Sequence, residues 1–556
     1  MSRDSSPFPR VTNLLVIAQS FLASVASAGQ YAITADPPVP RPSAKPCVVQ
    51  LFTEMRFDDF TPRSFEYAPP DQCPGPWAKV VLEGDFYVTA GRQYDRTANI
   101  WLGGANIYFG TTAEPSSTIS PSWHVERDLT DYAPLFTLPQ AGRVDLGNLV
   151  DPTYTGVIFG SVDLQLYPVD PSEDPPTTSD VVLPLSGSPT GGTVALQTSA
   201  DVLERSFTLP MNIERAYLDV VAQSQAGDEF WYLCVPDEVR TVLRSCGGTG
   251  FRETEIAIDG QPAGVAPIYP WIFTGGIDPY LWRPIPGVQA LNFVPYRVDL
   301  TPFAGVLSDG QAHSVAVRVF NANHNFATTA SLLLYLDPGA KQVTGGVTTN
   351  TLEGNPTPDQ QVDVSTVKGV TSGTVVIRSS RLFEIEGFVT TSHGRVDTRV
   401  AQGIDFSSSQ EFNVTSTSFA QDLTQTTSIS SVTTTTQGDV SREITRQFDW
   451  PLTLSFHSNP RPDGSTARTT IIREEYNDHG SLTEEGQPVS SSDISSVMST
   501  RDTLLLRGST VIGREDQASS HQYFSQDSSG ACYSRTINSE GGVVTEIVDG
   551  ERCTGG

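Results

Sequence analysis

"HSVAVRVFNA", residues 313–322, alternates apolar and polar side chains with a period of two, which is the pattern of a β-strand with one buried face. "SVDLQLYP" (161–168) and "TEIAIDG" (254–260) repeat this pattern, and "SLLLYLDP" (331–338) is a continuous apolar run typical of a fully buried strand. The 46 glycines and 40 prolines divide the 556 residues into short pieces, and no long stretch keeps a helical period. The sequence therefore predicts an all-β protein built of sandwiches or jelly rolls.

Two Pro-containing segments without apolar periodicity, 169–180 and 337–361, are typical of linkers. They divide the chain into two jelly-roll domains, at 29–168 and 181–336, and a third β-rich domain at 362–556. The third block contains a Ser/Thr-dense run, which predicts extended sheet that faces solvent.

The chain carries 63 acidic and 35 basic residues, a net charge of −28. Nucleic acid and anionic membranes would repel a protein this acidic, so we exclude both as partners.

The first 28 residues have the pattern of a secretory signal peptide. Arg3 and Arg10 precede the mostly apolar segment 14–25, and Ala26-Ser27-Ala28 provides a small-x-small cleavage site. The alternative is an N-terminal membrane anchor, but the apolar part is short for a membrane span. We expect a secreted protein, located outside the cell or in an acidic vacuolar compartment.

An even number of cysteines in a secreted chain favours disulfides. Sequence proximity gives one pairing among several possible ones: Cys47–Cys73, Cys234–Cys246 and Cys532–Cys553. No clustered Cys/His spacing occurs, so we expect no structural zinc site. Asn413 lies in the one N-glycosylation sequon, and we expect it on a surface loop.

Acidic residues stand next to aromatic ones at several places in the first two blocks. Such pairs suit carbohydrate, because sugar C–H faces stack on rings while hydroxyls bond to carboxylates and arginine. The candidate sugar platforms are Trp123, Trp231 and Trp282. The alternative is that these rings belong to the core and the carboxylates cap turns.

These motifs resemble a known family over about residues 45–340. The segments that carry the resemblance are "GRQYDRTANIWLGG" (91–104), "GTTAEP" (110–115), "WHVERDLTDY" (123–132), "LGNLVDPTYTG" (146–156), "GDEFWY" (227–232), "GFRE" (250–253), "IDGQPAG" (258–264) and "IYPWIFTGGIDPYLWRP" (268–284). The chain is similar to the peptide-N4-(N-acetyl-β-glucosaminyl)asparagine amidase A family of acidic plant and fungal glycoamidases. More distantly it resembles the bacterial peptide N-glycosidase F type, which implies two adjacent eight-stranded jelly rolls with the site at their interface.

The resemblance implies hydrolysis of the side-chain amide of a glycosylated asparagine in glycopeptides and glycoproteins, with no cofactor. Asp95 matches the principal catalytic aspartate of the bacterial type, as a general base or water-positioning residue. Arg96 is expected to pair with Asp95 or to polarise the amide. The alternative for both residues is an ordinary ion pair at a strand edge.

The second catalytic carboxylate is not fixed by the resemblance. This chain has Asn148 where the bacterial type carries a supporting Glu, and Gly248 where a rigid alignment places the second one. Glu229 and Glu253 are the candidates to replace it, and we favour Glu229 because it combines a predicted loop with neighbouring aromatics; the alternative is that Glu229 is a solvent-facing loop acid. Glu126, Asn148 and Arg252 are candidate substrate-binding residues.

Two other function classes remain open from the sequence. A glycoside hydrolase acting on N-glycans also uses paired carboxylates on a β scaffold, and a non-catalytic carbohydrate-binding protein would use the aromatics alone. Ser/His/Asp catalysis is not supported, because no GxSxG occurs and the seven histidines are scattered. His124 lies on the same strand face as Glu126, and we interpret it as structural.

Overall fold

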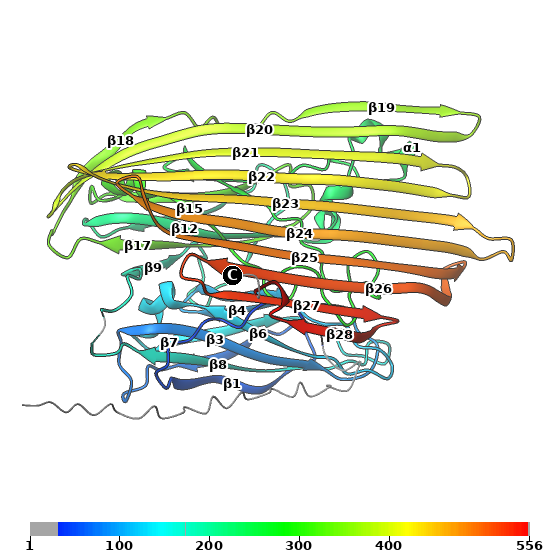
Figure 1. Ribbon diagram of the computed structural model, residues 1–556, viewed down its shortest axis with the longest axis horizontal. Helices are drawn as coiled ribbons and strands as arrows, with labels where there is room; N and C mark the ends of the chain where they lie inside the picture. The colour runs from blue at the N-terminus through cyan, green and yellow to red at the C-terminus, as the bar shows by residue number, and fades with distance from the viewer. Residues whose placement is uncertain (1–31, 173, 554–556) are drawn as a thin grey trace, which may run out of the picture.

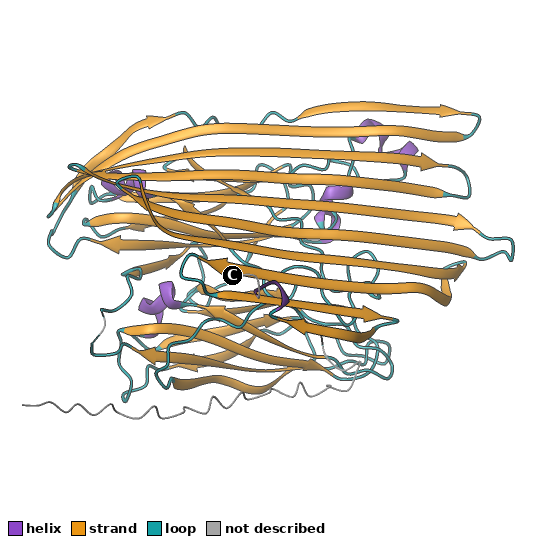
Figure 2. Cartoon of the chain, viewed as in Figure 1, coloured by secondary structure: helices purple, strands orange, loops and turns teal. Residues whose placement is uncertain are grey.

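A computed structural model describes residues 32–172 and 174–553, and it is all-β as predicted. Strands make up nearly all of the regular structure, and the helices are short pieces in the connections (Figure 2). These helices are η1 Thr130–Phe136, η2 Ala226–Asp228, η3 Trp231–Leu233, α1 Asp237–Leu243, η4 Thr301–Phe303, α2 Ala304–Leu307 and η5 Glu551–Cys553. Within the described ranges, no helix is long and apolar enough to cross a membrane. The predicted signal peptide lies outside the described residues.

The first sandwich consists of two antiparallel four-stranded sheets, in the orders β1-β8-β3-β6 and β2-β7-β4-β5. The strands are β1 Cys47–Phe57, β2 Arg63–Tyr67, β3 Trp77–Val88, β4 Thr97–Leu102, β5 Ala105–Thr111, β6 Ser122–Asp128, β7 Gln140–Leu146 and β8 Ile158–Pro168. Their inward side chains alternate with outward ones and form a core of their own, which includes Phe57, Ile100 and Leu164.

The second sandwich pairs a sheet of order β10-β17-β12-β15, with β9 beside β17, and a sheet of order β11-β16-β13-β14. The strands are β9 Val181–Pro184, β10 Val194–Leu196, β11 Leu203–Thr208, β12 Ile213–Ser224, β13 Glu253–Ile258, β14 Gln261–Pro267, β15 Tyr296–Asp299, β16 Ala312–Phe320 and β17 Phe326–Leu336. β17 is buried along almost its whole length, as its continuous apolar run predicts.

The last third of the chain forms one antiparallel sheet of 11 strands, in which β18 and β19 both pair with β20 and the rest follow in sequence order. Figure 1 shows its long strands running along the length of the molecule, with the first sandwich, in blue, at the bottom. The strands are β18 Thr344–Asn350, β19 Asp359–Val367, β20 Val370–Thr391, β21 Gly394–Val414, β22 Phe419–Gln437, β23 Val440–Pro460, β24 Thr466–Glu484, β25 Gln487–Arg507, β26 Thr510–Asp527, β27 Cys532–Glu540 and β28 Val543–Asp549.

One face of this long sheet is buried, which differs from the solvent-facing sheet that its composition predicts. Leu423 and Ile429, in the Ser/Thr-dense run, are 2% and 3% exposed and belong to the same core as Trp231 and Phe251 of the second sandwich. Small polar residues are tolerated here because they alternate with apolar residues that point into the core. The segment predicted as the second linker likewise contains strand β18.

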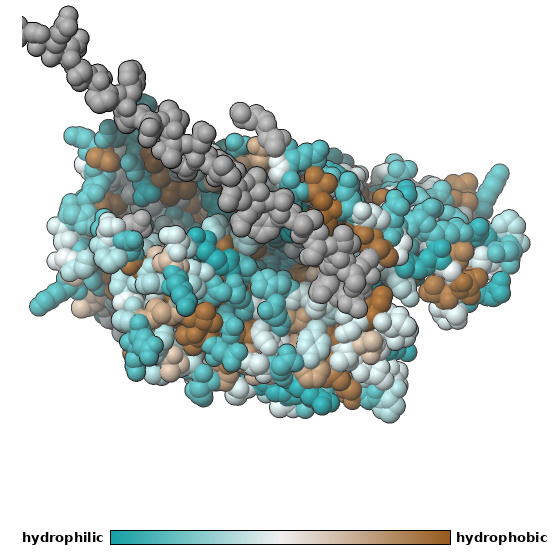
Figure 3. All heavy atoms as spheres, turned by 60° about the horizontal axis from the view of Figure 1, so that its bottom comes forward, coloured by the Kyte–Doolittle hydropathy of each residue, from teal (hydrophilic) through white to brown (hydrophobic). Residues whose placement is uncertain are grey.

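All three disulfides have the predicted pairing: Cys47–Cys73, Cys234–Cys246 and Cys532–Cys553. Asn413 is exposed but lies in β21, paired with Ala420, rather than on a loop. On the face of the molecule in Figure 3, hydrophilic residues predominate and apolar ones form small separate groups, as the acidic composition leads one to expect.

Candidate active site

A β-hairpin of the first sandwich brings two acidic residues together. β4 and β5 pair from Thr97 opposite Thr111, so the residues before β4 and those after β5 leave the sheet at the same end. The backbone N–H of Asp95 donates to Glu114 Oε1 over 3.2 Å, and the N–H of Arg96 donates to Thr112 Oγ1 over 2.9 Å. Asp95 and Glu114 are therefore neighbours, although 19 positions separate them in the chain.

The loop between β14 and β15 of the second sandwich closes over this pair. The hydroxyl of Thr274 donates to the backbone oxygen of Thr112, and Gly275 donates its N–H to the Asp95 carboxylate. A Cβ atom on Gly275 would overlap both Asp95 Oδ1 and Glu114 Oε1. Arg283 of the same loop donates from Nη2 to Glu114 Oε2 over 2.8 Å. The site thus lies where the two sandwiches meet.

A third carboxylate joins the pair from a turn of the second sandwich. The charge of Asp95 acts on the carboxyl of Glu229, which lies between η2 and η3. Its neighbour Asp228 fixes this turn: the buried carboxylate accepts N–H groups from residues 323–325 and forms an ion pair of 3.0 Å with Arg252. Arg252 therefore positions the Glu229 turn and does not face a substrate, contrary to the prediction that it binds one.

Burial sets the protonation of the three carboxyls. It raises the pKa of Asp95, although the Gly275 N–H and the charge of Arg96 act in the opposite direction. Burial, followed by the charge of Asp95, raises the pKa of Glu114 to about 7 and that of Glu229 also to about 7. Below neutral pH Glu114 and Glu229 are therefore mainly protonated, next to Asp95, whose charged form is favoured by the Gly275 N–H and by the charge of Arg96.

Arg96 does not form the strand-edge ion pair that was the alternative prediction. Its Nη2 donates to Gln93 Oε1 over 2.6 Å, and among the described residues its Nε is buried without a partner. The guanidinium lies 5.9 Å from the ring centroid of Tyr94, whose side chain is 46% exposed. Tyr94 in turn lies 5.4 Å from the half-buried Tyr154, and both tyrosines lie near enough to act on the charge of Arg96.

The sequence matches the family model "Peptide N-acetyl-beta-D-glucosaminyl asparaginase amidase A" over residues 38–353. The chain belongs to this family. It is 33% identical to peptide-N4-(N-acetyl-beta-glucosaminyl)asparagine amidase A of Prunus dulcis over 394 residues, which cover 67% of this chain and 68% of the relative.

Among solved structures, the chain is similar to PNGase F, a glycosylasparaginase from Flavobacterium meningosepticum, with a TM-score of 0.36 and 14% identity over 52% of this chain and 96% of that one. PNGF-II gave a TM-score of 0.35 and 13% identity over 52% of this chain and 66% of that one.

The three tryptophans predicted as sugar platforms are core residues in this family member. Trp123, Trp231 and Trp282 are 4%, 1% and 2% exposed, so none offers a ring face to a sugar. Trp123 stacks on Phe86 of β3, and Trp282 donates its Nε1 hydrogen to the backbone oxygen of Gly276. The last contact is internal to the β14–β15 loop and joins Trp282 to the residue after Gly275.

The other predicted residues lie apart from Asp95. Glu253, the other candidate for the second carboxylate, is buried and forms an ion pair with Arg381 of β20. Asn148 is also buried and donates to the backbone oxygens of Phe57 and Gly156. Glu126 accepts hydrogen bonds from Arg41 and lies beside His124, which lower its pKa to about 2. Over the described ranges, none of these three interacts with Asp95.

Sequence reasoning missed Glu114, Arg283 and Gly275, although all three lie in quoted motifs. The signal for Glu114 was the hairpin itself. Two short apolar runs joined by Gly103-Gly104 predict a tight turn, and counting outward from it places Asp95 opposite Thr112, two residues from Glu114. For Arg283 no local signal exists, because it reaches Glu114 from 169 positions away.

Proposed function

We propose that this chain hydrolyses the amide bond between the N-linked N-acetylglucosamine and asparagine of glycopeptides and glycoproteins. The glycan leaves intact as a glycosylamine, and aspartate remains in the peptide. Family membership supports this reaction class. The observation that carries it for this molecule is the cluster of Asp95, Glu114 and Glu229 at the junction of the two sandwiches.

In this proposal Asp95 is the base. The N–H of Gly275 and the charge of Arg96 both favour its charged form, which a base needs. A water molecule beside Asp95 attacks the amide carbon of the substrate and transfers a proton to the carboxylate. The guanidinium of Arg96, with a free Nε, is the cation that stabilises charge on the amide oxygen.

Glu229 is the acid. Its pKa of about 7 keeps it protonated in acidic solution, and no hydrogen bond from another described residue occupies its carboxyl group. It donates its proton to the amide nitrogen as the C–N bond breaks, so the leaving group departs as a neutral glycosylamine. Glu114 is committed to Arg283 and the Asp95 backbone, and it positions rather than reacts.

Tyr94, which is exposed, and its half-buried neighbour Tyr154 replace the buried tryptophans as the proposed sugar platform. Tyr94 lies next to Arg96 and contacts the half-buried Tyr154, and stacking against a sugar C–H face needs an accessible ring such as Tyr94.

The test is a defined N-glycopeptide incubated at acidic pH, with the products weighed. Aspartate in the peptide together with a complete free glycan is the expected result. A single N-acetylglucosamine left on asparagine would indicate a glycoside hydrolase, and retention without any product would indicate a carbohydrate-binding protein. Addition of EDTA should leave turnover unchanged, since the proposed steps use only side chains of the chain.

We also propose that the protein is secreted, to the cell exterior or an acidic vacuole. Three disulfides support an oxidising compartment, and the raised carboxyl pKa values favour function in acid. N-terminal sequencing of the native protein tests this, because cleavage should occur after Ala28.

A further inference from the structure

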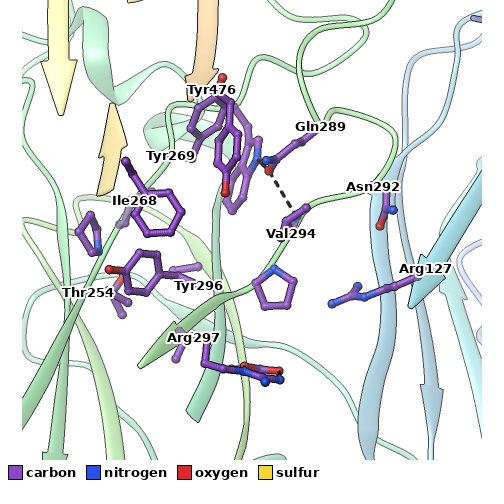
Figure 4. A pocket seen from close by; sticks show the side chains of 18 of the residues that line it. Arg127, Thr254, Ile268, Tyr269, Gln289, Asn292, Val294, Tyr296, Arg297 and Tyr476 are labelled. Atoms are coloured by element: carbon purple, nitrogen blue, oxygen red, sulfur yellow. Dashed lines mark hydrogen bonds and ion pairs between the residues drawn. The ribbon is translucent and has the colours of Figure 1, made fainter. Parts of the chain in front are cut away.

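A second cavity lies apart from the Asp95 cluster, where the first sandwich, the second sandwich and the long sheet meet. Its volume is about 570 Å³, which is the size of a small-molecule site. β6 of the first sandwich, the 289–297 segment of the second and β22–β24 of the long sheet line it, and it shares no residue with the Asp95 cluster. Figure 4 shows its side chains.

One arginine that lines this cavity forms no ion pair with another described residue. Arg297 pairs with Asp131 and Asp219, and Arg446 pairs with Asp478, so both are neutralised. Arg127 of β6 has no ion pair within the described part of the chain, and its Nη1 is buried without a hydrogen-bond partner. In Figure 4 its side chain points from β6 into the cavity. Burial lowers the pKa of Arg127, although Tyr132 and the charge of Asp219 act in the opposite direction, and an anion bound at Nη1 would further favour the charged guanidinium.

An unpaired acceptor stands on the same wall. Asn292 donates from Nδ2 to the backbone oxygen of Glu126 over 2.9 Å, which fixes its amide next to β6. Its Oδ1 is buried and has no partner among residues 32–172 and 174–553. A buried amide oxygen in this state favours a ligand that brings an O–H or N–H donor.

The opposite wall is aromatic. The half-buried rings of Tyr296 and Tyr476 line the space, with Trp450 stacked on Tyr476 at 6.0 Å between ring centroids. We propose that the cavity binds a sugar residue that carries a carboxylate, such as a uronic acid. Its carboxylate pairs with Arg127, a hydroxyl donates to Asn292, and its C–H face packs on Tyr296. This site would give the protein a second carbohydrate contact, outside the cluster proposed to cleave the amide.

The test compares methyl β-glucuronide with methyl β-glucoside, which differ only in the carboxylate, by titration calorimetry against the full chain. We expect the glucuronide to bind at least about tenfold more tightly, the usual effect of one charge-assisted hydrogen bond. Arg127→Gln should remove this preference, while Arg56→Gln, which changes an arginine 58% exposed, should keep it. Equal binding of the two sugars by the unaltered protein would overturn the proposal without any variant having to fold.

Two further outcomes also decide the question. An acidic dipeptide, acetyl-Glu-Glu-amide, that displaces the glucuronide and binds more tightly would identify the site as a peptide site and overturn the sugar assignment. Turnover of a neutral glycopeptide by Arg127→Gln should stay within about twofold of normal, because the cavity and the Asp95 cluster share no residue. A large loss of that turnover would show that the cavity and the Asp95 cluster act as one site, and it would contradict the inference.

Discussion

Gly275→Ala is the substitution that most directly tests how the active site is assembled. Gly275 is the point where the second sandwich contacts both carboxyls of the first, through its N–H to Asp95 and its bare Cα. A methyl group there would lie 2.6 Å from Glu114 Oε1, whereas ordinary contacts begin near 3.4 Å, and it would overlap Asp95 Oδ1 as well. The loop or the carboxyls must therefore move by at least about 0.8 Å, and by more at Asp95, which is the closer of the two.

A displacement of this size has a large effect on a reaction that depends on alignment. Misplacing a reacting group by about 1 Å costs roughly 100-fold in rate, which corresponds to about 2.7 kcal/mol in the barrier. We expect kcat to fall by about that factor while KM changes little, since the proposed sugar platform at Tyr94 is untouched. The backbone at Gly275 is not in the left-handed region, so the alanine itself introduces no backbone strain.

The assay is release of glycan from a labelled glycopeptide, with thermal unfolding measured in parallel. Gly187→Ala is the matched control, because a Cβ atom there meets nothing within 4 Å and its backbone is equally permissive. Gly187→Ala should unfold at the temperature of the unaltered protein and Gly275→Ala at most a few degrees below it, and only Gly275→Ala should lose turnover. A kcat for Gly275→Ala within twofold of the control would refute the assembly described for this site.

Three other substitutions probe single groups. Asp95→Asn should lower kcat by about 100-fold or more, because the geometry survives and the base does not, whereas the exposed Asp71→Asn should have no effect in the same assay. Turnover should decline as pH rises through about 7, where Glu229 loses its proton. The pH–rate profile of Glu229→Gln should lack this decline at alkaline pH. If the decline persists in the variant, Glu229 is not the acid. Glu474 is fully buried, and burial raises its pKa to about 8. The stability that its protonated form contributes is therefore complete below pH about 4.5 and is lost as the pH rises toward 8. The melting temperature of Glu474→Gln should depend less on pH over that range than that of the unaltered protein.

Much of the fold could be predicted from the sequence, because strands follow from local alternation and glycine-rich turns. The runs around residues 161–168 and 313–322 lie in β8 and β16, as predicted. The burial of one face of the long sheet was missed, because alternating serines, threonines and small apolar residues read the same whether a second layer covers them or not. What covers a strand is a property of the whole fold, and β22 is covered by residues from the second sandwich.

The candidate site was predictable only where a residue was identified by its own motif. Asp95 and Glu229 stand in distinctive segments, and the structure brings them together. Glu253 stands in an equally distinctive segment, yet its partner is Arg381, 128 positions away. The tryptophans show the same limit. An aromatic residue next to an acidic one has the same sequence pattern whether its ring faces solvent or the core, and only the packing of the folded chain distinguishes the two.

The long sheet also contacts the β14–β15 loop, so the candidate site does not depend on the two sandwiches alone. Gln517 of β26 donates from Nε2 to the backbone oxygens of Tyr280 and Arg283, over 2.8 and 2.9 Å, and Thr500 of β25 donates to that of Leu281. These contacts hold the segment from which Arg283 reaches Glu114. Hydrogen bonds from buried side chains to the backbone of a loop restrict the position of that loop. The long sheet therefore helps to position the Asp95 cluster through the loop, without contributing a residue to the cluster. Its strands therefore support the candidate site, because they fix the loop whose residues contact the Asp95 and Glu114 carboxyls.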